Sequence, residues 1–371
     1  MGVDESITSE PALAALVERV RAAQAHSTPL EIVGSGSKRF YGEAPQGEPL
    51  DVRRLAGISS YEPTELVVSA RCGTPLAELE AALAECGQCL AFEPPHFGPA
   101  ATVGGMVAAG LAGPARAVAG GVREHVLGAT LLNGRAEVLS FGGQVMKNVA
   151  GYDVSRLLAG SLGVLGVILE VSLKVLPVAP ATATLRFELA QADALAQLNR
   201  WGGLPLPLHA SAWWDGILVV RLRGAAAAID AALPALGGEV IEPQLAASFW
   251  HGLREQSDEF FVGARRAVRG APDARLWRLS VPQTAAPLAL SGEQLIEWDG
   301  AQRWLCSAAP AAQVREAAAK AGGHATIFEA QDRSGGVFAP LSAPLERIHR
   351  ELKRAFDPAG VFNPGRLYPG L

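Results

Sequence analysis

The sequence has few aromatic residues and few charged residues, and each shortage excludes a class of protein. Aromatic side chains make up 6% of the 371 residues, too few for a surface that stacks on sugars or bases. Charged side chains make up 19%, and the net charge of −5 lacks the positive excess that binds nucleic acids. Hydrophobic residues make up 49%, so the chain can bury a large core, and disorder and coiled coil are both poor fits.

Cysteine is also scarce, with residues at positions 72, 86, 89 and 306 only. Cys86 and Cys89 have CxxC spacing, but the further ligands that a zinc ribbon or an iron–sulfur cluster requires are missing. An isolated CxxC recurs by chance, so we predict no metal site in this chain. Any iron–sulfur cluster then belongs to another protein.

Strongly hydrophobic runs are missing as well. Residues 97–115 carry no charge, but Ala and Gly dominate them. A transmembrane helix needs about 20 strongly apolar residues, so this stretch does not predict one. The acidic start of the chain resembles neither a secretory nor a transit signal. We predict a cytoplasmic globular protein, which can still dock onto a membrane-bound partner.

Apolar spacing and turn residues predict the elements of the first half. Thr74 is expected to cap a helix with Pro75 at its first position, and Asn133-Gly134 to join two strands as a hairpin. The predicted helices cover residues 10–26, 74–85 and 102–110, and the predicted strands cover 30–33, 65–70, 126–132, 136–140 and 165–176.

Residues 177–180 are the best candidate for a domain boundary, because they contain two prolines and the density of motifs falls beyond them. We predict one domain over residues 1–180 and a second over residues 181–371. In the second, strands over 185–189, 217–222 and 276–281 alternate with helices over 191–201, 225–236 and 311–321. This pattern is typical of an α+β layer with antiparallel strands.

Glycine is abundant, with 41 positions, and several glycines gather in three loops of the first half. The first loop, Gly34-Ser-Gly-Ser-Lys38, follows a predicted strand and offers successive N–H groups, small side chains and one cation, which suits a phosphate. By itself this motif is a weak signal and is more often a tight turn that binds nothing. Similar clusters at 94–105 and 148–166 suggest backbone wrapped around one extended ligand.

The order of these motifs resembles the FAD-binding domain of the vanillyl-alcohol-oxidase-type flavoproteins, in the branch of glycolate oxidase and D-lactate dehydrogenase. The resemblance covers residues 28–180 densely and returns at Phe362-Asn-Pro-Gly-Arg366. It implies an α+β fold: a two-part PCMH-type FAD-binding domain followed by a shortened, ferredoxin-like α+β domain that ends in the Asn-Pro-Gly-Arg turn.

The resemblance also implies which residues bind FAD. The pyrophosphate loop of the family falls on residues 34–38, its Thr-x-Gly-Gly element on residues 102–105 and its late glycine element on residues 160–168. The expected cofactor-binding residues are Gly34, Ser35, Gly36, Ser37, Lys38, Pro95, Thr102, Gly104, Gly105, Arg123, Gly160, Ser161, Gly163, Gly166, Ile168, Asn363 and Arg366. Glu124 replaces the aspartate that the family carries after Arg123.

Departures from the family narrow the expected chemistry. The pyrophosphate loop has no histidine, so FAD is expected to bind noncovalently. The Gly-His-x-Gly-Asp-Gly-Asn-x-His stretch of catalytic relatives is reduced to Gly322-Gly-His-Ala, without its acidic residue or second histidine. Oxidising a 2-hydroxy acid needs a cation for the carboxylate and a base for the hydroxyl proton. The candidates for the group that holds the carboxylate are Arg186, Arg221, Arg278 and His324, although residues of these types more often lie at the surface or serve in packing. The role of His96, in a loop of the first half, stays open.

These features favour an FAD-binding subunit of a glycolate oxidase complex. In the scheme that the family implies, a sister FAD-binding catalytic subunit oxidises glycolate to glyoxylate, and an iron–sulfur subunit passes electrons to quinone at the inner face of the cytoplasmic membrane. Two alternatives stay open: a self-sufficient FAD-dependent 2-hydroxy-acid dehydrogenase, and a structural subunit without flavin.

Overall fold

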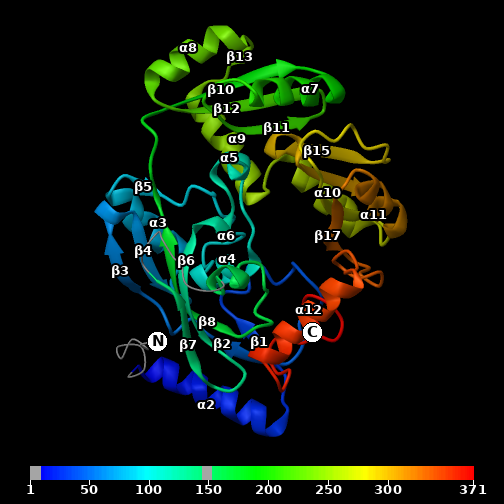
Figure 1. The fold of residues 1–371 in the computed structure, drawn as a ribbon. Coiled ribbons are helices and arrows are strands. Elements are labelled where there is room, and N and C mark those ends of the chain that lie inside the picture. The colour runs from blue at the N-terminus through cyan, green and yellow to red at the C-terminus, as the bar shows by residue number, and fades with distance from the viewer. Residues whose placement is uncertain (1–9, 144–152) are drawn as a thin grey trace. The chain divides into compact units, whose positions relative to one another are not determined.

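The structure is a computed structural model that describes residues 10–143 and 153–371. It divides into two compact units that are interleaved along the chain (Figure 1). Unit 1 comprises residues 1–111, 121–177 and 340–371, and unit 2 comprises residues 112–120 and 178–339. These units are defined by contacts in space, and the C-terminal residues 340–371 belong to unit 1. They are therefore a different kind of division from the two domains predicted along the sequence, and the predicted boundary stays a prediction.

One layer of unit 1 is built around a pair of parallel strands, β1 (Leu30–Val33) and β2 (Glu48–Asp51). Helix α2 (Pro11–His26) precedes them and buries Leu13, Leu16 and Val20, whose spacing of three and four residues places them on one face. The C-terminal segment continues this layer: Phe362 forms a parallel bridge with Leu30. Residues far apart in the sequence therefore meet at the start of β1.

The other layer of unit 1 is an antiparallel sheet in the order β3-β4-β8-β6-β7. The strands of this sheet are β3 (Ile58–Glu62), β4 (Val67–Arg71), β6 (Val126–Leu132), β7 (Val138–Gly142) and β8 (Val167–Lys174). Strand β6 is buried along its whole length, which explains its continuous apolar sequence. The predicted hairpin forms at Asn133, whose side-chain oxygen accepts hydrogen bonds from the N–H groups of Arg135 and Glu137.

Short elements and helices complete unit 1. The remaining elements are η1 (Pro63–Glu65), α3 (Leu76–Glu85), β5 (Gln88–Cys89), α4 (Val103–Ala109), α6 (Val122–His125), η2 (Ser155–Leu158), β9 (Leu176–Pro177) and α12 (Ala343–Phe356). The prediction that Thr74 caps the second helix is wrong: α3 begins at Leu76, after Pro75. The Thr74 hydroxyl bonds instead to the backbone of Gly57, as donor to its oxygen and acceptor from its nitrogen.

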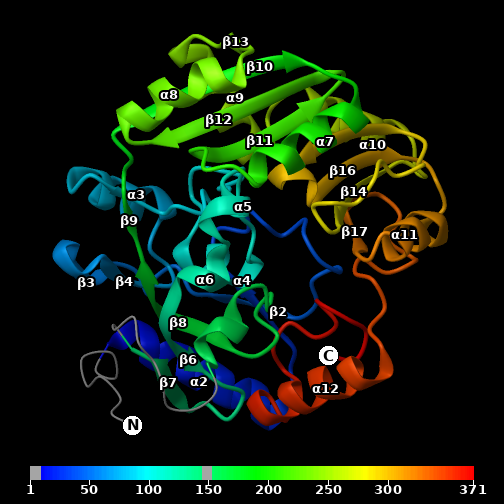
Figure 2. The ribbon, with the colours of Figure 1, turned by 45° about the horizontal axis from the view of Figure 1, so that its top comes forward.

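Unit 2 contains one antiparallel sheet in the order β13-β10-β12-β11-β15-β16-β14-β17 (Figure 2). The strands of its first half are β10 (Ala181–Glu188), β11 (Leu208–Trp214), β12 (Ile217–Gly224) and β13 (Glu239–Val240), and those of its second half are β14 (Arg275–Ser280), β15 (Glu293–Glu297), β16 (Gln302–Ser307) and β17 (His324–Ala330). Each half has the strand order of a ferredoxin-like fold, and the halves join edge to edge through β11 and β15.

Helices cover both faces of this sheet. Besides α5 (Arg116–Ala119) and η3 (Trp298–Gly300), the helices of unit 2 are α7 (Gln191–Gly202), α8 (Ala226–Leu236), α9 (Pro243–Glu255), α10 (Glu259–Gly270) and α11 (Ala311–Lys320). α7 and α8 share one hydrophobic cluster with β10 and β12, and α11 packs on β14, β16 and β17. On the opposite face Phe261 of α10 stacks edge-on against Trp304. The antiparallel strands and interspersed helices of the second half are typical of an α+β layer with helices on one side of the sheet only, and that prediction is incomplete.

Candidate functional site

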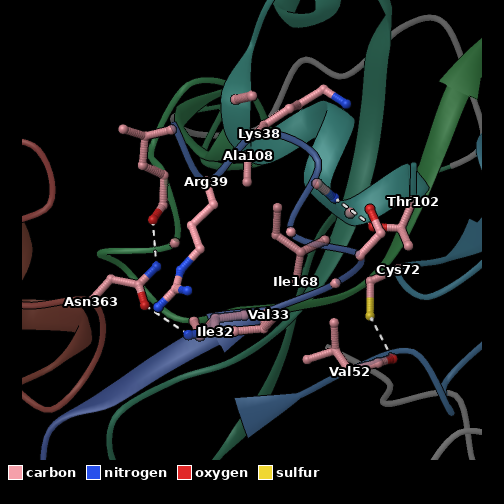
Figure 3. Close-up of a pocket in the computed structure, with 18 of the residues that line it drawn as sticks. Ile32, Val33, Lys38, Arg39, Val52, Cys72, Thr102, Ala108, Ile168 and Asn363 are labelled. Carbon is pink, nitrogen blue, oxygen red and sulfur yellow. Dashed lines mark hydrogen bonds between the residues drawn. The ribbon is translucent and has the colours of Figure 1, made fainter. Parts of the chain in front are cut away.

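A pocket opens in unit 1 where β1 ends, and all of its walls come from this unit (Figure 3). It encloses about 840 Å³ of empty space, part of which is open to solvent. The lining residues are Glu31, Ile32, Val33, Gly34, Ser35, Gly36, Ser37, Lys38, Arg39, Val52, Cys72, Thr102, Gly104, Gly105, Ala108, Ala109, Leu162, Gly163, Gly166, Ile168, Asn363 and Arg366.

The loop of residues 34–38 presents its backbone to this pocket. Within the described residues, the N–H groups of Gly34, Ser35 and Gly36 donate no hydrogen bond, so they are available to an anionic ligand. Gly36 has a φ of +75°, which side chains rarely adopt, and open space lies where its Cβ would stand. The Lys38 ammonium is held nearby, donating to the carbonyl of His96 at 3.0 Å.

Helix α4 begins beside this loop and leaves no room for larger residues. Thr102 caps the helix, as its hydroxyl accepts a hydrogen bond from the N–H of Gly105 at 3.2 Å. A Cβ at Gly34 would lie 2.5 Å from the same hydroxyl oxygen. A Cβ at Gly104 would lie 2.6 Å from the Cβ atom of Cys72. The glycines therefore allow the loop and the helix to approach closely around the pocket.

The C-terminal turn forms another wall. The Asn363 side chain accepts a hydrogen bond from the N–H of Ile32 at 2.7 Å and donates to the carbonyl of Leu162 at 2.6 Å (Figure 3). Arg366 donates to the carbonyls of Arg39 and Tyr41. This turn thus joins β1, the loop after it and the loop containing Gly163.

A buried ion pair holds this C-terminal turn in place. Lys353, on α12, donates to the carboxylate of Asp357 at 2.8 Å and to the carbonyls of Val164 and Phe362 at 2.9 and 2.7 Å. Asp357 in turn accepts the N–H of Phe362 at 2.8 Å. All three protons of the ammonium are used, as a buried charge requires. We call Lys353 and Asp357 the C-terminal clamp; nothing in the family resemblance pointed to it.

Two ionisable groups of the pocket are occupied by other interactions. The buried carboxylate of Glu31 forms a two-pronged ion pair with Arg39, with both N–O distances at 2.8 Å. The thiol of Cys72 is fully buried, and desolvation raises its pKa to about 12, so it stays protonated at neutral pH. Cys72 therefore offers no thiolate at neutral pH, and the Glu31 carboxylate is committed to its ion pair with Arg39.

The pocket brings together most of the residues expected from the sequence. Loop 34–38, Thr102, the glycines at 104, 105, 163 and 166, Ile168, Asn363 and Arg366 all line it. Pro95, Arg123, Gly160 and Ser161 lie outside its lining. Pro95 is buried, Arg123 is exposed on α6, and the Ser161 hydroxyl accepts the N–H of Gly163. The glycine cluster predicted from residue 148 begins outside the described residues. The cofactor-binding role of each of these residues stays a prediction.

Sequence reasoning missed several walls of the pocket. Val52, Cys72, Ala108 and Leu162 line it, as does the Glu31–Arg39 pair. Their sequence contexts are those of ordinary core residues, and only the alternation of β1 marked Glu31 as a polar residue within an apolar strand. His96 stands apart from the pocket lining, with Nε2 at 3.1 Å from the carboxylate of Glu80 on α3.

These walls fit FAD. The N–H groups of residues 34–36 and the nearby Lys38 suit a pyrophosphate, which needs convergent donors and positive charge. The apolar side chains of Ile32, Val33, Val52, Ala108 and Ile168 suit flat ring systems. Among the described residues, no group of three His, Cys, Asp or Glu side chains could hold a metal ion. Nor is any described helix long and apolar enough to cross a membrane.

Residues 12–142 match the protein family described as an FAD binding domain. The chain is 50% identical to glycolate oxidase subunit GlcE of Escherichia coli over 357 residues, which cover 96% of this chain and 97% of that protein. It is 28% identical to glycolate oxidase subunit GlcD of Bacillus subtilis over 46% of this chain and 37% of that protein. It is 34% identical to a D-lactate dehydrogenase of Archaeoglobus fulgidus over 41% of this chain and 34% of that protein.

A solved structure of an alkyldihydroxyacetonephosphate synthase has the same fold. It superposes with a TM-score of 0.62 at 15% identity and covers 94% of this chain and 74% of its own. The predicted fold class, a mixed helix-and-sheet protein with an FAD-binding domain, is confirmed, as is the prediction of FAD as the cofactor.

Proposed function

Because the chain belongs to the family of glycolate oxidase subunit GlcE, we propose that it is the FAD-binding subunit of a complex that oxidises glycolate to glyoxylate. The observation that carries this proposal is the pocket of unit 1, where unengaged backbone N–H groups face the space between glycine loops. The chemistry that FAD supplies when bound is two-electron oxidation of a 2-hydroxy acid, with onward release of the electrons.

The residues of the pocket bind and orient the cofactor in this proposal. The N–H groups of residues 34–36 hold the pyrophosphate, and Asn363 fixes β1 against the loop of Gly163 so that the walls keep their spacing. FAD is held noncovalently, since no histidine stands in loop 34–38. Apolar walls exclude water from the ring systems.

The ionisable groups of the pocket favour a subunit that works with a partner. Taking the proton of a substrate hydroxyl requires a base, and in this lining Glu31 is ion-paired and Cys72 is held protonated. A self-sufficient dehydrogenase would need a base from elsewhere. We therefore propose that a sister flavoprotein of the GlcD type performs the substrate oxidation, consistent with the shared sequence of the two subunits.

The remaining partners follow from the same scheme. We propose that an iron–sulfur subunit takes the electrons onward to quinone, because the cysteines of this chain lack cluster spacing. The complex would then lie peripherally on the inner face of the cytoplasmic membrane. Mixing the purified chain with each partner and measuring the mass of the products by light scattering tests this assembly; a chain that stays monomeric with both partners present contradicts it.

The decisive test of the activity uses the visible absorption of the purified chain under anaerobic conditions. Flavin bands that stay oxidised when glycolate is added alone, and bleach when the GlcD-type subunit is present, are the expected result. Bands that bleach with the chain alone would make it a dehydrogenase in its own right. The absence of flavin bands, with no binding of added FAD, would reduce the chain to a structural subunit.

A further inference from the structure

Among the candidate cations of the second half, one differs from the others in its surroundings. Arg186 is partly exposed and forms ion pairs with Glu188 and Glu239. Arg221 donates to the ring of His209 at 3.1 Å and stacks on Trp250. Both guanidinium groups are therefore committed to structural contacts.

Arg278, on β14, is held at one end and open at the other. Its Nε donates to the side-chain oxygen of Gln302 at 2.7 Å. Across residues 10–143 and 153–371, no group accepts a hydrogen bond from its Nη1 or Nη2. The residue is half-buried, so these nitrogens belong to a cation that is partly removed from water without an anionic partner in hydrogen-bond contact. A guanidinium in this state presents the planar fork that matches a carboxylate.

A buried network sets the direction of that fork. Gln302 donates to Glu297 at 3.2 Å, and the indole of Trp304 donates to the same carboxyl oxygen at 2.6 Å. Glu297 is fully buried, which raises its pKa to about 7 and leaves its carboxyl only partly charged at neutral pH. It therefore orients Gln302, and through it Arg278, without fully neutralising the cation.

A tryptophan on the η3 turn lies against the guanidinium group of Arg278. The Trp298 ring lies 5.4 Å from the guanidinium carbon of Arg278, and Arg116 stacks over the same ring at 4.9 Å. The Trp298 indole is anchored by donating to the carbonyl of Gly113 at 3.0 Å. Trp298 and Asp299 both have left-handed backbones, with φ of 53° and 55°. Such strain persists only where the surroundings impose it, and it gathers at functional sites.

We propose that Arg278, with Arg116 against the same Trp298 ring, forms a binding site in unit 2 for the carboxylate of a small 2-hydroxy or 2-oxo acid. The inference rests on the proposed function, since that function makes glycolate and glyoxylate the acids to expect. The site adds a property that the flavin pocket lacks: it recognises the charged end of the substrate or product. It requires no base in this chain, so the chain can hold the acid whether or not it oxidises it.

The test is isothermal titration of the FAD-loaded chain with glycolate under anaerobic conditions. Glycolamide, which has the same shape without the negative charge, serves as the control ligand. The variant Arg278→Gln removes the fork and Arg278→Lys keeps the charge without it. Arg186→Gln removes a partly exposed, ion-paired arginine from the same sheet and is the matched control. FAD content and the far-ultraviolet circular dichroism spectrum are recorded for every variant.

We expect glycolate, but not glycolamide, to bind the wild type, with affinity reduced at least tenfold in Arg278→Gln, less in Arg278→Lys and not at all in Arg186→Gln. FAD content should be equal in all four proteins. Three results would overturn the site: no binding of glycolate by the flavin-loaded wild type, equal binding of glycolamide, or unchanged affinity in Arg278→Gln. Failure to load FAD would instead count against the proposed function, so the two failures are distinguishable.

Discussion

The two units of this protein build their candidate sites from different materials. The pocket of unit 1 is made of backbone: glycines with restricted geometry, N–H groups and an asparagine that ties three segments together. The site around Arg278 in unit 2 is made of side chains that hydrogen-bond and stack on one another. A site made of backbone groups needs glycine or other particular residue types at fixed spacings along the chain. A site made of side chains needs only residues that the fold brings together, whatever their spacing in the sequence. The first kind therefore leaves a pattern in the sequence and the second does not.

The largest expected effect on stability comes from a change in the C-terminal clamp. The clamp residues do not line the pocket of unit 1, but they hold the C-terminal turn that forms one of its walls. Lys353→Met leaves the fully buried Asp357 without its partner, and such losses destabilise proteins by about 3–5 kcal/mol. We expect the free energy of unfolding, from urea denaturation, to fall by about this amount, together with weaker binding of FAD.

Arg350→Met is the matched control for the clamp. Arg350 and Glu346 form an ion pair with the same four-residue spacing on the same helix, but both side chains are about half exposed. Exposed pairs contribute about 0.2–1 kcal/mol, so this variant should be nearly unchanged. Similar losses in both variants would mean that α12 depends on its surface charges and that no clamp exists.

Next in size is the pH dependence of unit 2. Burial raises the pKa of Glu297 to about 7 in the folded protein, from 4.5 for an exposed glutamate. The folded state therefore binds this proton more tightly than the unfolded state. The protonated carboxyl makes its full contribution to the free energy of unfolding below pH 4.5, and this contribution is lost as the pH rises through 7. The shift corresponds to about 3 kcal/mol.

Glu297→Gln isolates this contribution from the titration of all other groups. The difference in unfolding free energy between wild type and Glu297→Gln should move by about 3 kcal/mol in favour of the variant between pH 4.5 and pH 8. Denaturant titrations at several pH values measure it. A difference that is constant with pH would show that the network around Arg278 contains an ordinary, solvated carboxylate.

A smaller effect, on affinity rather than stability, compares two glycines with similar backbones. Gly36 and Gly87 have φ of +75° and +65°, and neither has an atom within 4 Å of a would-be Cβ. Alanine at either position costs about 1–2 kcal/mol of backbone strain. Only Gly36 lines the pocket, so Gly36→Ala should weaken FAD binding about tenfold, as measured by quenching of flavin fluorescence. An equal loss of FAD affinity in Gly87→Ala would show that the effect of Gly36→Ala does not come from its place in the pocket.

The sequence allowed most of unit 1 to be predicted, for physical reasons. The spacing of Leu13, Leu16 and Val20 indicated α2, and Asn133-Gly134 indicated a hairpin, because short-range geometry decides both. The start of α3 was misplaced because the Thr74 hydroxyl bonds to Gly57, a contact 17 residues away. Both faces of the unit 2 sheet carry helices, which local periodicity cannot reveal.

The candidate sites divide in the same way. Loop 34–38 and Asn363 stand in motifs whose residue types are dictated by backbone geometry, so they could be found without a structure. The clamp and the Glu31–Arg39 pair could not, because nothing local marks Lys353 or Glu31 as buried. Arg278 was one of several equivalent arginines in the sequence. Only its neighbours, Gln302 on the next strand and Trp298 on a turn, distinguish it.

Noncovalent binding of FAD by unit 1 is tested most simply by the visible spectrum of the purified chain before and after acid precipitation. We expect flavin absorption bands in the native protein, and their complete transfer to the supernatant after precipitation, because backbone groups of unit 1 hold FAD without a covalent bond. A purified chain that shows no flavin bands and does not bind added FAD would contradict FAD binding by unit 1, and flavin that remains with the precipitated protein would contradict noncovalent attachment.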